Sequence, residues 1–399
     1  MIGGSEMISY EGLENKLAEK GLTRSDLTKK LGISSRTVAK ISKGEKLSRI
    51  VLVKISDFLG CEPTELYHEE RIITTYSDYG HDDRNTMKKI VIFGGGTGIS
   101  NILSGLKLFP VDVTAIIAVS DDGSSTGVLK EELDIPAVGD LGKVLLSMAN
   151  VDEDFIRLLG YRFKKSGSLH NHPVRNILLA ALIDLKGDLT EASKYMSGLL
   201  RVKGTVLPLT EEKVELIGYG ENQVYVGEVA VGQHVKDIDY IAYDHPFRVN
   251  AEVIRKIMDA DLIIFSPGSL YTSIIPHLIA PDIREALSET EAPLMYISNL
   301  VTQPGETDGY TVSDHIKVLN RYLTNRKIDV VLANSGGVDP EIAKIYRNKE
   351  NKFRVELDKD EVERCGARLI TDDMVRIDRG YIVHDELKTA YLVFSSLMK

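Results

Sequence analysis

The residues best suited to chemistry lie just after an apolar stretch near position 90. The run Gly94-Gly95-Gly96-Thr97-Gly98 follows Ile90–Phe93 and precedes Ile99–Leu108, whose apolar residues have helical spacing. A strand, a glycine loop and a helix in this order bring backbone N–H groups and the positive end of a helix dipole to one point, which favours a phosphate. Glycines suit a sharp turn that a ligand approaches without meeting a Cβ. The loop matches neither G-x-G-x-x-G nor a P-loop, so it indicates phosphate binding without naming the ligand.

A pair of carboxylates follows the next apolar run. Val113–Val119 ends near Asp121 and Asp122, which precede a run of hydroxyls and glycines that includes Ser124. A carboxylate after the second strand of a doubly wound sheet lies where a ribose binds. The same residues could instead cap the following helix, Val128–Leu133, or the carboxylates could hold Mg²⁺ beside substrate phosphates. We include Asp121, Asp122 and Ser124 in the predicted nucleotide site, with either aspartate as the candidate metal ligand.

Two further polar segments follow apolar strands later in the chain. Ser266–Ser273 comes after Leu262–Phe265, and Asn299–Asp308 comes after Leu294–Ile297. Ligands of open α/β sheets bind outside the carboxyl ends of the strands, so these segments are expected at the same edge as the glycine loop. From them we predict that Ser269 and Thr272 donate to phosphate, that Asn299 and Gln303 contact base or sugar edges, and that Tyr271 belongs to the same site.

Apolar strands alternate with helical segments after Met87. This alternation predicts an α/β fold, a Rossmann-like doubly wound and mostly parallel sheet with helices on both faces. The expected strands are Ile90–Phe93, Val113–Val119, Leu262–Phe265, Leu294–Ile297 and Val330–Leu332. The expected helices are Gly139–Ala149, Asp154–Phe163, Val174–Leu185, Asn250–Met258, Pro281–Leu287 and Val312–Leu323.

Composition narrows the class of protein. The chain of 399 residues is long enough for two domains, and 43% hydrophobic residues can fill a core. No window approaches the ~18 apolar residues of a membrane span, and the N-terminus lacks the pattern of a signal peptide. Cys61 and Cys365 lie far apart and fit no metal or disulfide spacing. We therefore expect a reduced, cytoplasmic protein with no membrane partner.

The N-terminal region is basic, although the whole chain is acidic. Between Gly21 and Lys54 there are nine basic and two acidic residues, a charge of +7; the whole chain carries −10, so the remainder carries −17. A local basic patch on an acidic protein is typical of a nucleic-acid surface. Thr23 and Asp26 have the spacing of a capping box, and Ser34 can cap the next predicted helix, Ser35–Ser42, after a glycine turn.

This region resembles the Cro/repressor-like (XRE) helix-turn-helix family from about Ile8 to Leu66. The resemblance implies a small all-α DNA-binding domain at residues 7–70, followed by a linker at 71–86 and the α/β domain at 87–399. It places Ser35, Arg36 and Thr37 near bases and Lys40 and Lys43 near phosphates. The alternative is a helical bundle that mediates dimerisation or protein contact.

The blocks after Met87 together resemble the YvcK/CofD-like family. They occur in family order and read GGGTG, SDDGSSTG, HNHPVRNILLAAL, ADLIIFSPGSLYTSIIPHL and NLVTQPGETDGYTVSDH. The last two favour the YvcK (gluconeogenesis factor) branch. The resemblance implies a Rossmann-like core that binds a nucleotide sugar, typically UDP-N-acetylglucosamine, or NAD, with no required cofactor. It also implies a regulator that links carbon metabolism to cell-wall precursor supply and cell shape.

Several positions depart from the family pattern. Gly142 and Lys143 stand where the family has an arginine and an asparagine, and Arg175 stands where it has a glycine. Val383 replaces the arginine before His-Asp. Asn176 and Tyr346 match the pattern, and the resemblance includes both in the ligand site.

These observations predict a cytoplasmic regulator whose nucleotide-sugar occupancy alters DNA binding. A homodimer is expected because helix-turn-helix modules commonly bind paired half-sites, and a protein of amino-sugar metabolism is a candidate partner. One alternative is a Mg²⁺-dependent transferase of the CofD type, whose relatives transfer a phospholactyl group to a deazaflavin precursor. Another is a partner-binding regulator whose helix-turn-helix no longer contacts DNA.

Overall fold

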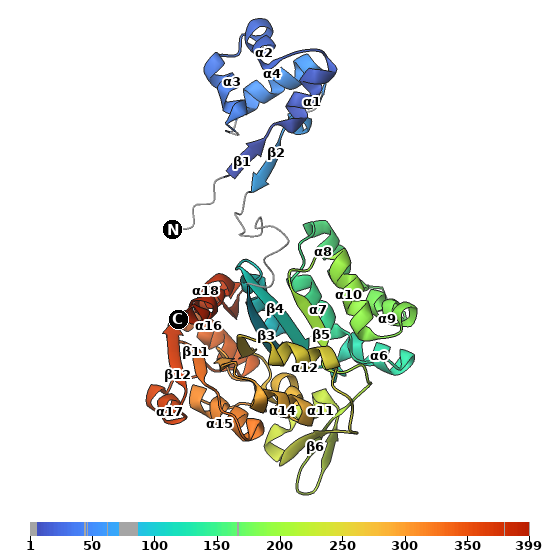
Figure 1. The fold of residues 1–399 in the computed structure, drawn as a ribbon, viewed down its shortest axis with the longest axis vertical. Helices are drawn as coiled ribbons and strands as arrows, with labels where there is room; N and C mark the ends of the chain where they lie inside the picture. The colour runs from blue at the N-terminus through green and yellow to red at the C-terminus, as the bar shows by residue number, and fades with distance from the viewer. Residues whose placement is uncertain are drawn as a thin grey trace. The chain divides into compact units, whose positions relative to one another are not determined.

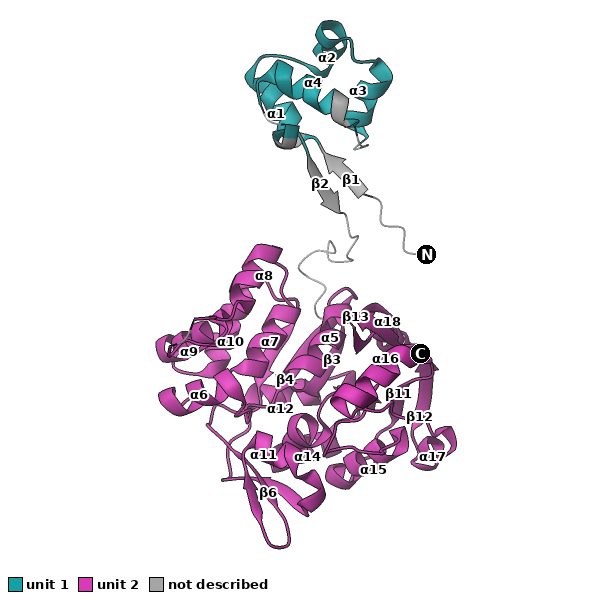
Figure 2. Ribbon diagram, turned by 180° about the vertical axis from the view of Figure 1, so that it is seen from behind, with its two compact units in different colours: residues 1–80 teal, residues 81–399 magenta. Residues whose placement is uncertain are grey.

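The computed structural model describes residues 6–43, 45, 47–61, 63–71, 87–165, 167–378 and 380–398 (Figure 1). Contacts between residues divide the chain into two compact units, residues 1–80 and 81–399 (Figure 2). Each unit has a hydrophobic core of its own. Apart from Arg71, the linker expected at 71–86 lies outside the described residues.

The first unit contains the predicted helix-turn-helix. Its helices are α1 (Glu11–Glu19), α2 (Arg24–Leu31), α3 (Ser35–Ser42), α4 (Arg49–Leu59) and the 3₁₀ turn η1 (Pro63–Glu65). The predicted caps form: the Thr23 N–H donates to the Asp26 carboxylate at 2.9 Å, and the Ser34 hydroxyl accepts from the Thr37 N–H at 3.1 Å. Gly32, which ends α2, has a φ of 64°, a conformation that favours glycine.

The sequence predicted an all-α unit, but the structure also contains two short strands. Strand β1 (Glu6–Ser9) pairs antiparallel with β2 (His68–Arg71), so the two ends of the unit are joined. Each strand has four residues, too few to show an alternating pattern that could be recognised in the sequence.

The second unit is built on a seven-stranded sheet in the order β12-β11-β10-β9-β3-β4-β5, and all its pairings are parallel. The strands are β3 (Lys88–Gly94), β4 (Val111–Ile117), β5 (Thr205–Pro208), β9 (Leu262–Phe265), β10 (Leu294–Ile297), β11 (Val330–Asn334) and β12 (Arg368–Asp372). The chain moves outward from β3 to β5, returns to β9 and then moves outward the other way. The predicted doubly wound topology is confirmed, and the order reverses between β3 and β9.

Helices cover both faces of this sheet (Figure 1). One core contains Ile90 and Ile92, and the other contains Val91 and Phe93, so successive side chains of β3 point into different layers. The first layer includes α5 (Gly96–Leu106), α6 (Ser124–Leu133), α7 (Gly139–Ser147), α8 (Glu153–Gly160), α9 (Val174–Lys186), α10 (Leu189–Leu199) and α18 (Glu386–Leu397). The second includes α12 (Ala251–Met258), α13 (Ile275–Leu278), α14 (Pro281–Glu289), α15 (Val312–Leu323) and α17 (Lys359–Arg364). Burial on both faces explains the nearly continuous apolar strands.

Smaller elements surround the carboxyl edge of the sheet. Between β5 and β9 the chain forms β6 (Leu216–Tyr219), β7 (Val224–Val226), α11 (Glu228–Gln233), η4 (Val235–Asp237) and β8 (Tyr240–Tyr243). The π-helical turn η5 (Leu270–Ile274) follows β9, and α16 (Pro340–Ile345) and a second such turn, η6 (Tyr346–Glu350), follow β11. Near the C-terminus β13 (Val375–Asp378) and β14 (Tyr381–His384) form a hairpin. No helix in the described part of the chain has the length and apolar character to cross a membrane.

The close approach of β3–α5 to the loop after β9 gives a stability prediction. A Cβ on Gly98 would overlap the carbonyl oxygen of Pro267, whereas a Cβ on Gly198, in α10, would meet no atom within 4 Å. We expect Gly98→Ala to lower the free energy of unfolding by about 1–3 kcal/mol, because overpacking forces the backbone to shift. The matched change Gly198→Ala should raise it by up to about 1 kcal/mol through helix propensity. Denaturant unfolding measures both, and equal stability of the two variants would contradict the packing argument.

Candidate functional site

The glycine loop lies at the point where the strand order reverses. Gly94 ends β3, Gly95 is the N-cap of α5, and Gly96, Thr97 and Gly98 form the first turn of that helix. A cavity of about 450 Å³ opens there. Its lining brings together segments that are far apart in the sequence: Gly95, Gly96, Thr97, Gly98, Asn101, Asp121, Asp140, Lys143, Glu228, Pro267, Gly268, Ser269, Ser273, Asn299, Leu300, Val301, Gln303, Lys352, Ile382, Val383 and His384.

The reason that the loop requires glycine differs in part from the sequence expectation. None of Gly94 to Gly98 has a positive φ, so left-handed backbone is not what these positions need. The limiting factor is space. A Cβ on Gly96 would overlap the Asp140 carboxylate, and one on Gly94 would overlap the Ser266 hydroxyl. The loop therefore remains free of side chains chiefly because the protein's own groups press against it.

The loop after β9 is held in place by Asn299 and Glu306. The Asn299 amide accepts from the Gly268 N–H at 3.1 Å and donates to the Gly268 carbonyl at 2.7 Å. The Glu306 carboxylate accepts from the Ser269 hydroxyl at 2.6 Å and from the Tyr271 N–H at 2.7 Å. Asn299 thus positions this loop with both ends of its amide. Glu306 is only 5% exposed and was missed, although it belongs to the polar run Asn299–Asp308.

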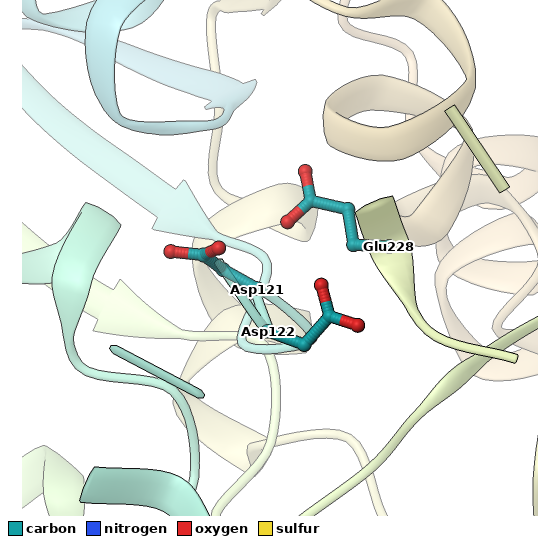
Figure 3. Close-up of side chains that lie close together, drawn as sticks. All are labelled: Asp121, Asp122 and Glu228. Atoms are coloured by element: carbon teal, nitrogen blue, oxygen red, sulfur yellow. The ribbon is translucent and has the colours of Figure 1, made fainter. Parts of the chain in front are cut away.

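Three carboxylates converge beside the glycine loop (Figure 3). Asp121 and Asp122 follow β4, and Glu228 is the first residue of α11; one oxygen from each lies within 4.8 Å of the others. Asp121 accepts from the Gly123 N–H at 2.9 Å, and Asp122 accepts from the Val229 N–H at 3.0 Å. Glu228, which was not predicted from the sequence, enters from the insertion between β5 and β9.

The carboxylates repel one another in a partly buried place. Burial, with repulsion from Asp140, raises the pKa of Asp121, and burial with repulsion from Asp121 and Asp140 raises the pKa of Glu228 well above its ordinary value. Lys143 pairs with Asp140 at 2.7 Å. Because carboxylate oxygens are the usual ligands of Mg²⁺ and Ca²⁺, Asp121, Asp122 and Glu228 could together hold one divalent cation.

Three of the predicted site residues, Ser124, Thr272 and Tyr271, are not among the residues that line the cavity. Ser124 is exposed at the start of α6, which begins there rather than at Val128. Thr272 is buried and donates its N–H to the Ser269 hydroxyl at 3.0 Å. The Tyr271 hydroxyl lies 3.1 Å from that of Tyr310.

Tyr346 lines a second cavity of about 450 Å³ and accepts from the Ile382 N–H at 2.7 Å. The two cavities share Val301, Lys352 and Ile382 as lining residues. A ligand longer than one cavity could therefore extend from the glycine loop towards Tyr346.

Two of the positions that depart from the family pattern are in contact. A Cβ on Gly142 would lie 3.2 Å from Cδ of Arg175, so the arginine of α9 packs against the glycine of α7. Asn176, the next residue, is buried, and its Oδ1 has no hydrogen-bond partner.

In the first unit, the predicted DNA-contact residues lie along α3. Ser35 and Arg36 are exposed, as is Lys43 just after the helix, while Thr37 and Lys40 are half-buried. Ile41 points inward and is buried. The helix therefore presents a polar and basic face of the kind that major-groove recognition uses.

The raised pKa of Glu228 predicts a pH dependence of stability. In the unfolded chain Glu228 loses its proton near the ordinary glutamate pKa, whereas the folded protein retains the proton to a higher pH. The free energy of unfolding therefore falls as the pH rises from the ordinary glutamate pKa to the raised pKa of the folded protein. Glu228→Gln should remove this loss and raise stability near neutral pH by on the order of 1 kcal/mol. Thermal unfolding between about pH 5 and pH 8 checks it. The control is Asp154→Asn, at an exposed carboxylate of α8. Identical pH slopes for wild type and Glu228→Gln would contradict the assignment.

Both units match known families. Residues 90–375 match the family described as 2-phospho-L-lactate transferase CofD, and residues 12–68 match the Cro/C1-type HTH DNA-binding domain. These ranges fall within the two units of the structure.

Individual relatives agree with this assignment. The gluconeogenesis factor of Bacillus subtilis (strain 168) is 41% identical over 315 residues, which are 77% of this chain and 98% of that protein. The putative gluconeogenesis factor of Thermotoga maritima is 37% identical over 277 residues, 69% of this chain and 87% of that protein. The crystal structure of protein BH3568 from Bacillus halodurans superposes with a TM-score of 0.74 at 34% identity, covering 78% of this chain and 100% of that one. The chain therefore belongs to the CofD family, in its YvcK or gluconeogenesis-factor branch, and carries a Cro/C1-type helix-turn-helix domain at its N-terminus.

Proposed function

We propose that the second unit binds a nucleotide sugar of the UDP-N-acetylglucosamine type and acts as a regulator. The observation that carries the proposal is the cavity at the reversal of strand order, which the N-terminus of α5 borders with Gly95 to Gly98. The first N–H groups of a helix have no partner within it, and the helix dipole favours negative charge at that end. A diphosphate fits this position, and the resemblance of the sequence blocks to the YvcK branch implies a nucleotide sugar as the class of ligand.

The surrounding residues give each part of such a ligand a partner. Thr97 supplies a hydroxyl at the phosphate, and Asp121 or Asp122 takes the ribose hydroxyls or a bound cation. The buried Oε1 of Gln303, which has no hydrogen-bond partner, is available to a base or sugar N–H or hydroxyl. The connected cavity at Tyr346 gives room for the far end of the ligand, whether a sugar or the second nucleoside of NAD.

In this proposal, ligand binding to the second unit changes how the first unit binds DNA. A cytoplasmic homodimer contacts DNA through α3, and nucleotide-sugar occupancy changes that contact. The protein would thereby link carbon metabolism to cell-wall precursor supply and cell shape, alone or with a protein partner of amino-sugar metabolism. A first unit that contacts only protein is the alternative.

A CofD-type transferase is the second candidate, because the three carboxylates lie beside the glycine loop. Asp121, Asp122 and Glu228 would hold Mg²⁺, which would neutralise charge on the diphosphate linkage as the acceptor hydroxyl takes the phospholactyl group and the nucleoside monophosphate leaves. The protein would be incubated with an activated phospholactate, an acceptor and Mg²⁺. A transferase would release a nucleoside monophosphate, and this release would require the acceptor, Mg²⁺ and Asp122. A regulator releases none.

Ligand binding is tested at Gly96. The change Gly96→Ala forces the Asp140 carboxylate away from the loop and disturbs its pairing with Lys143. We expect at least about ten-fold weaker binding of UDP-N-acetylglucosamine by calorimetry, a loss of about 1.4 kcal/mol. Gly160→Ala, at the end of α8 with no atom within 4 Å of the added Cβ, is the matched control. Unchanged affinity in a folded Gly96→Ala protein would remove the glycine loop from the ligand site.

DNA binding is tested on α3. Arg36→Ala should cost about 1–3 kcal/mol and relax sequence preference, because residues at the start of a recognition helix contact bases. Lys43→Ala should weaken binding to all DNA duplexes alike. It should also reduce the slope of log affinity against log salt concentration by about one, since a phosphate contact releases counterions. Arg157→Ala, on exposed α8 of the other unit, is the control. Selection from a random duplex pool that enriches no sequence, with or without nucleotide sugar, would favour the protein-contact alternative.

A further inference from the structure

Arg175 is a buried arginine for which the described residues provide no ion pair. It lies in the first turn of α9, only 7% of its surface is exposed, and its Nε has no hydrogen-bond partner. Burial, assisted by Arg162, lowers the pKa of Arg175 to about 10, and Asp140 acts in the opposite direction. Asp140 is thus the carboxylate that acts on this charge, but it forms no ion pair with Arg175. A buried charge without an ion-pair partner is unfavourable, and a bound anion would compensate it.

The Arg175 side chain packs against Gly142 of α7. Cγ and Cδ of Arg175 lie 3.5 and 3.2 Å from the position of a Cβ on Gly142, so a larger residue at 142 would take the space of the arginine. Gly142 belongs to α7, the helix that contributes Asp140 and Lys143 to the cavity lining. Asp140 pairs with Lys143 at 2.7 Å and does not form an ion pair with Arg175.

The first turn of α9 offers further unpaired groups. Asn176 is only 2% exposed, and its Oδ1 has no partner. The helix has 13 residues, its N-cap is Pro173, and no side chain caps its N-terminus. The nearby His172 is already engaged, since its Nδ1 lies 2.8 Å from the Ser125 hydroxyl. A guanidinium donor and an amide acceptor therefore stand unpaired at the positive end of one helix.

We propose that Arg175 and Asn176 form a subsite for the phosphate group of a hydroxylated small molecule. The guanidinium fork matches two phosphate oxygens. The Asn176 Oδ1 accepts from a hydroxyl next to the phosphate, and the dipole of α9 adds positive potential at its N-terminus. The subsite extends the ligand site proposed above and lies on the α7–α9 side of it, apart from the glycine loop.

The test uses the full chain and inorganic phosphate as the anion. Thermal unfolding and calorimetry are measured against phosphate at constant ionic strength, with chloride as the reference. Wild type should gain stability saturably with phosphate. Arg175→Met keeps the apolar stem and removes the charge; it should be at least as stable as wild type without phosphate and bind phosphate about ten-fold more weakly or worse. Arg175→Lys should retain part of the affinity, and Arg157→Met, at an exposed arginine, should behave as wild type.

Other outcomes separate this proposal from the function proposed above. If Arg175→Met is destabilised without phosphate and keeps wild-type phosphate affinity, the arginine is structural and the subsite is refuted. If Gly96→Ala abolishes the phosphate effect and Arg175→Met does not, the anion binds at the glycine loop; the subsite then fails while the nucleotide-sugar site stands. A glucosamine phosphate that binds wild type more tightly than inorganic phosphate, with the advantage lost in Asn176→Ala, supports the hydroxyl contact.

Discussion

The contact between Gly98 and the Pro267 carbonyl is the constraint around which the second unit is arranged. It joins the loop after β3 to the loop after β9, the two central strands between which the strand order reverses. Because the chain leaves these strands towards opposite sides of the sheet, their loops diverge and open a cavity above the contact. The first turn of α5 is thereby fixed at the cavity with its N–H groups facing outward from the sheet edge.

Charge is distributed unevenly around this contact. Asp121, Asp122, Asp140 and Glu228 gather on the β4 side, with Lys143 as the cation paired to one of them. The loop on the β9 side is held instead by neutral hydrogen bonds from Asn299 and by the buried carboxylate of Glu306. A ligand that combines a phosphate with hydroxyl groups, with or without a cation, is compatible with both sides. The acidic groups are thus clustered on the β4 side, whereas the β9 side has one buried carboxylate, Glu306, whose pKa is raised by burial.

Helices α7 and α9 also show how a residue on one helix makes room for a residue on its neighbour. Gly142 leaves room for the Arg175 stem, and the Nε of the guanidinium has no hydrogen-bond partner among the described residues. This contact between two helices becomes visible only once the helices are packed together.

Local sequence determined the elements whose stability comes from their own residues. Apolar runs of three to seven residues specified the inner strands, the glycine loop followed β3 as predicted, and Thr23, Asp26 and Ser34 formed the predicted caps. The edge strands β5 and β12 were missed. β5 (TVLP) is buried but too short to stand out from its surroundings, whereas β12 (RLITD) is only partly buried and lacks the apolar signature of strands covered on both faces.

Only the tertiary structure decided which side chains share the site. Glu228 reaches Asp121 from an insertion more than a hundred residues away, Asp140 presses on Gly96 from α7, and Arg175 approaches from α9. It also gave Asn299, which lines the cavity, a part in holding the β9 loop. These contacts depend on how the crossovers pack over the sheet, whereas spacing along the chain reports only local periodicity and the ends of helices and strands.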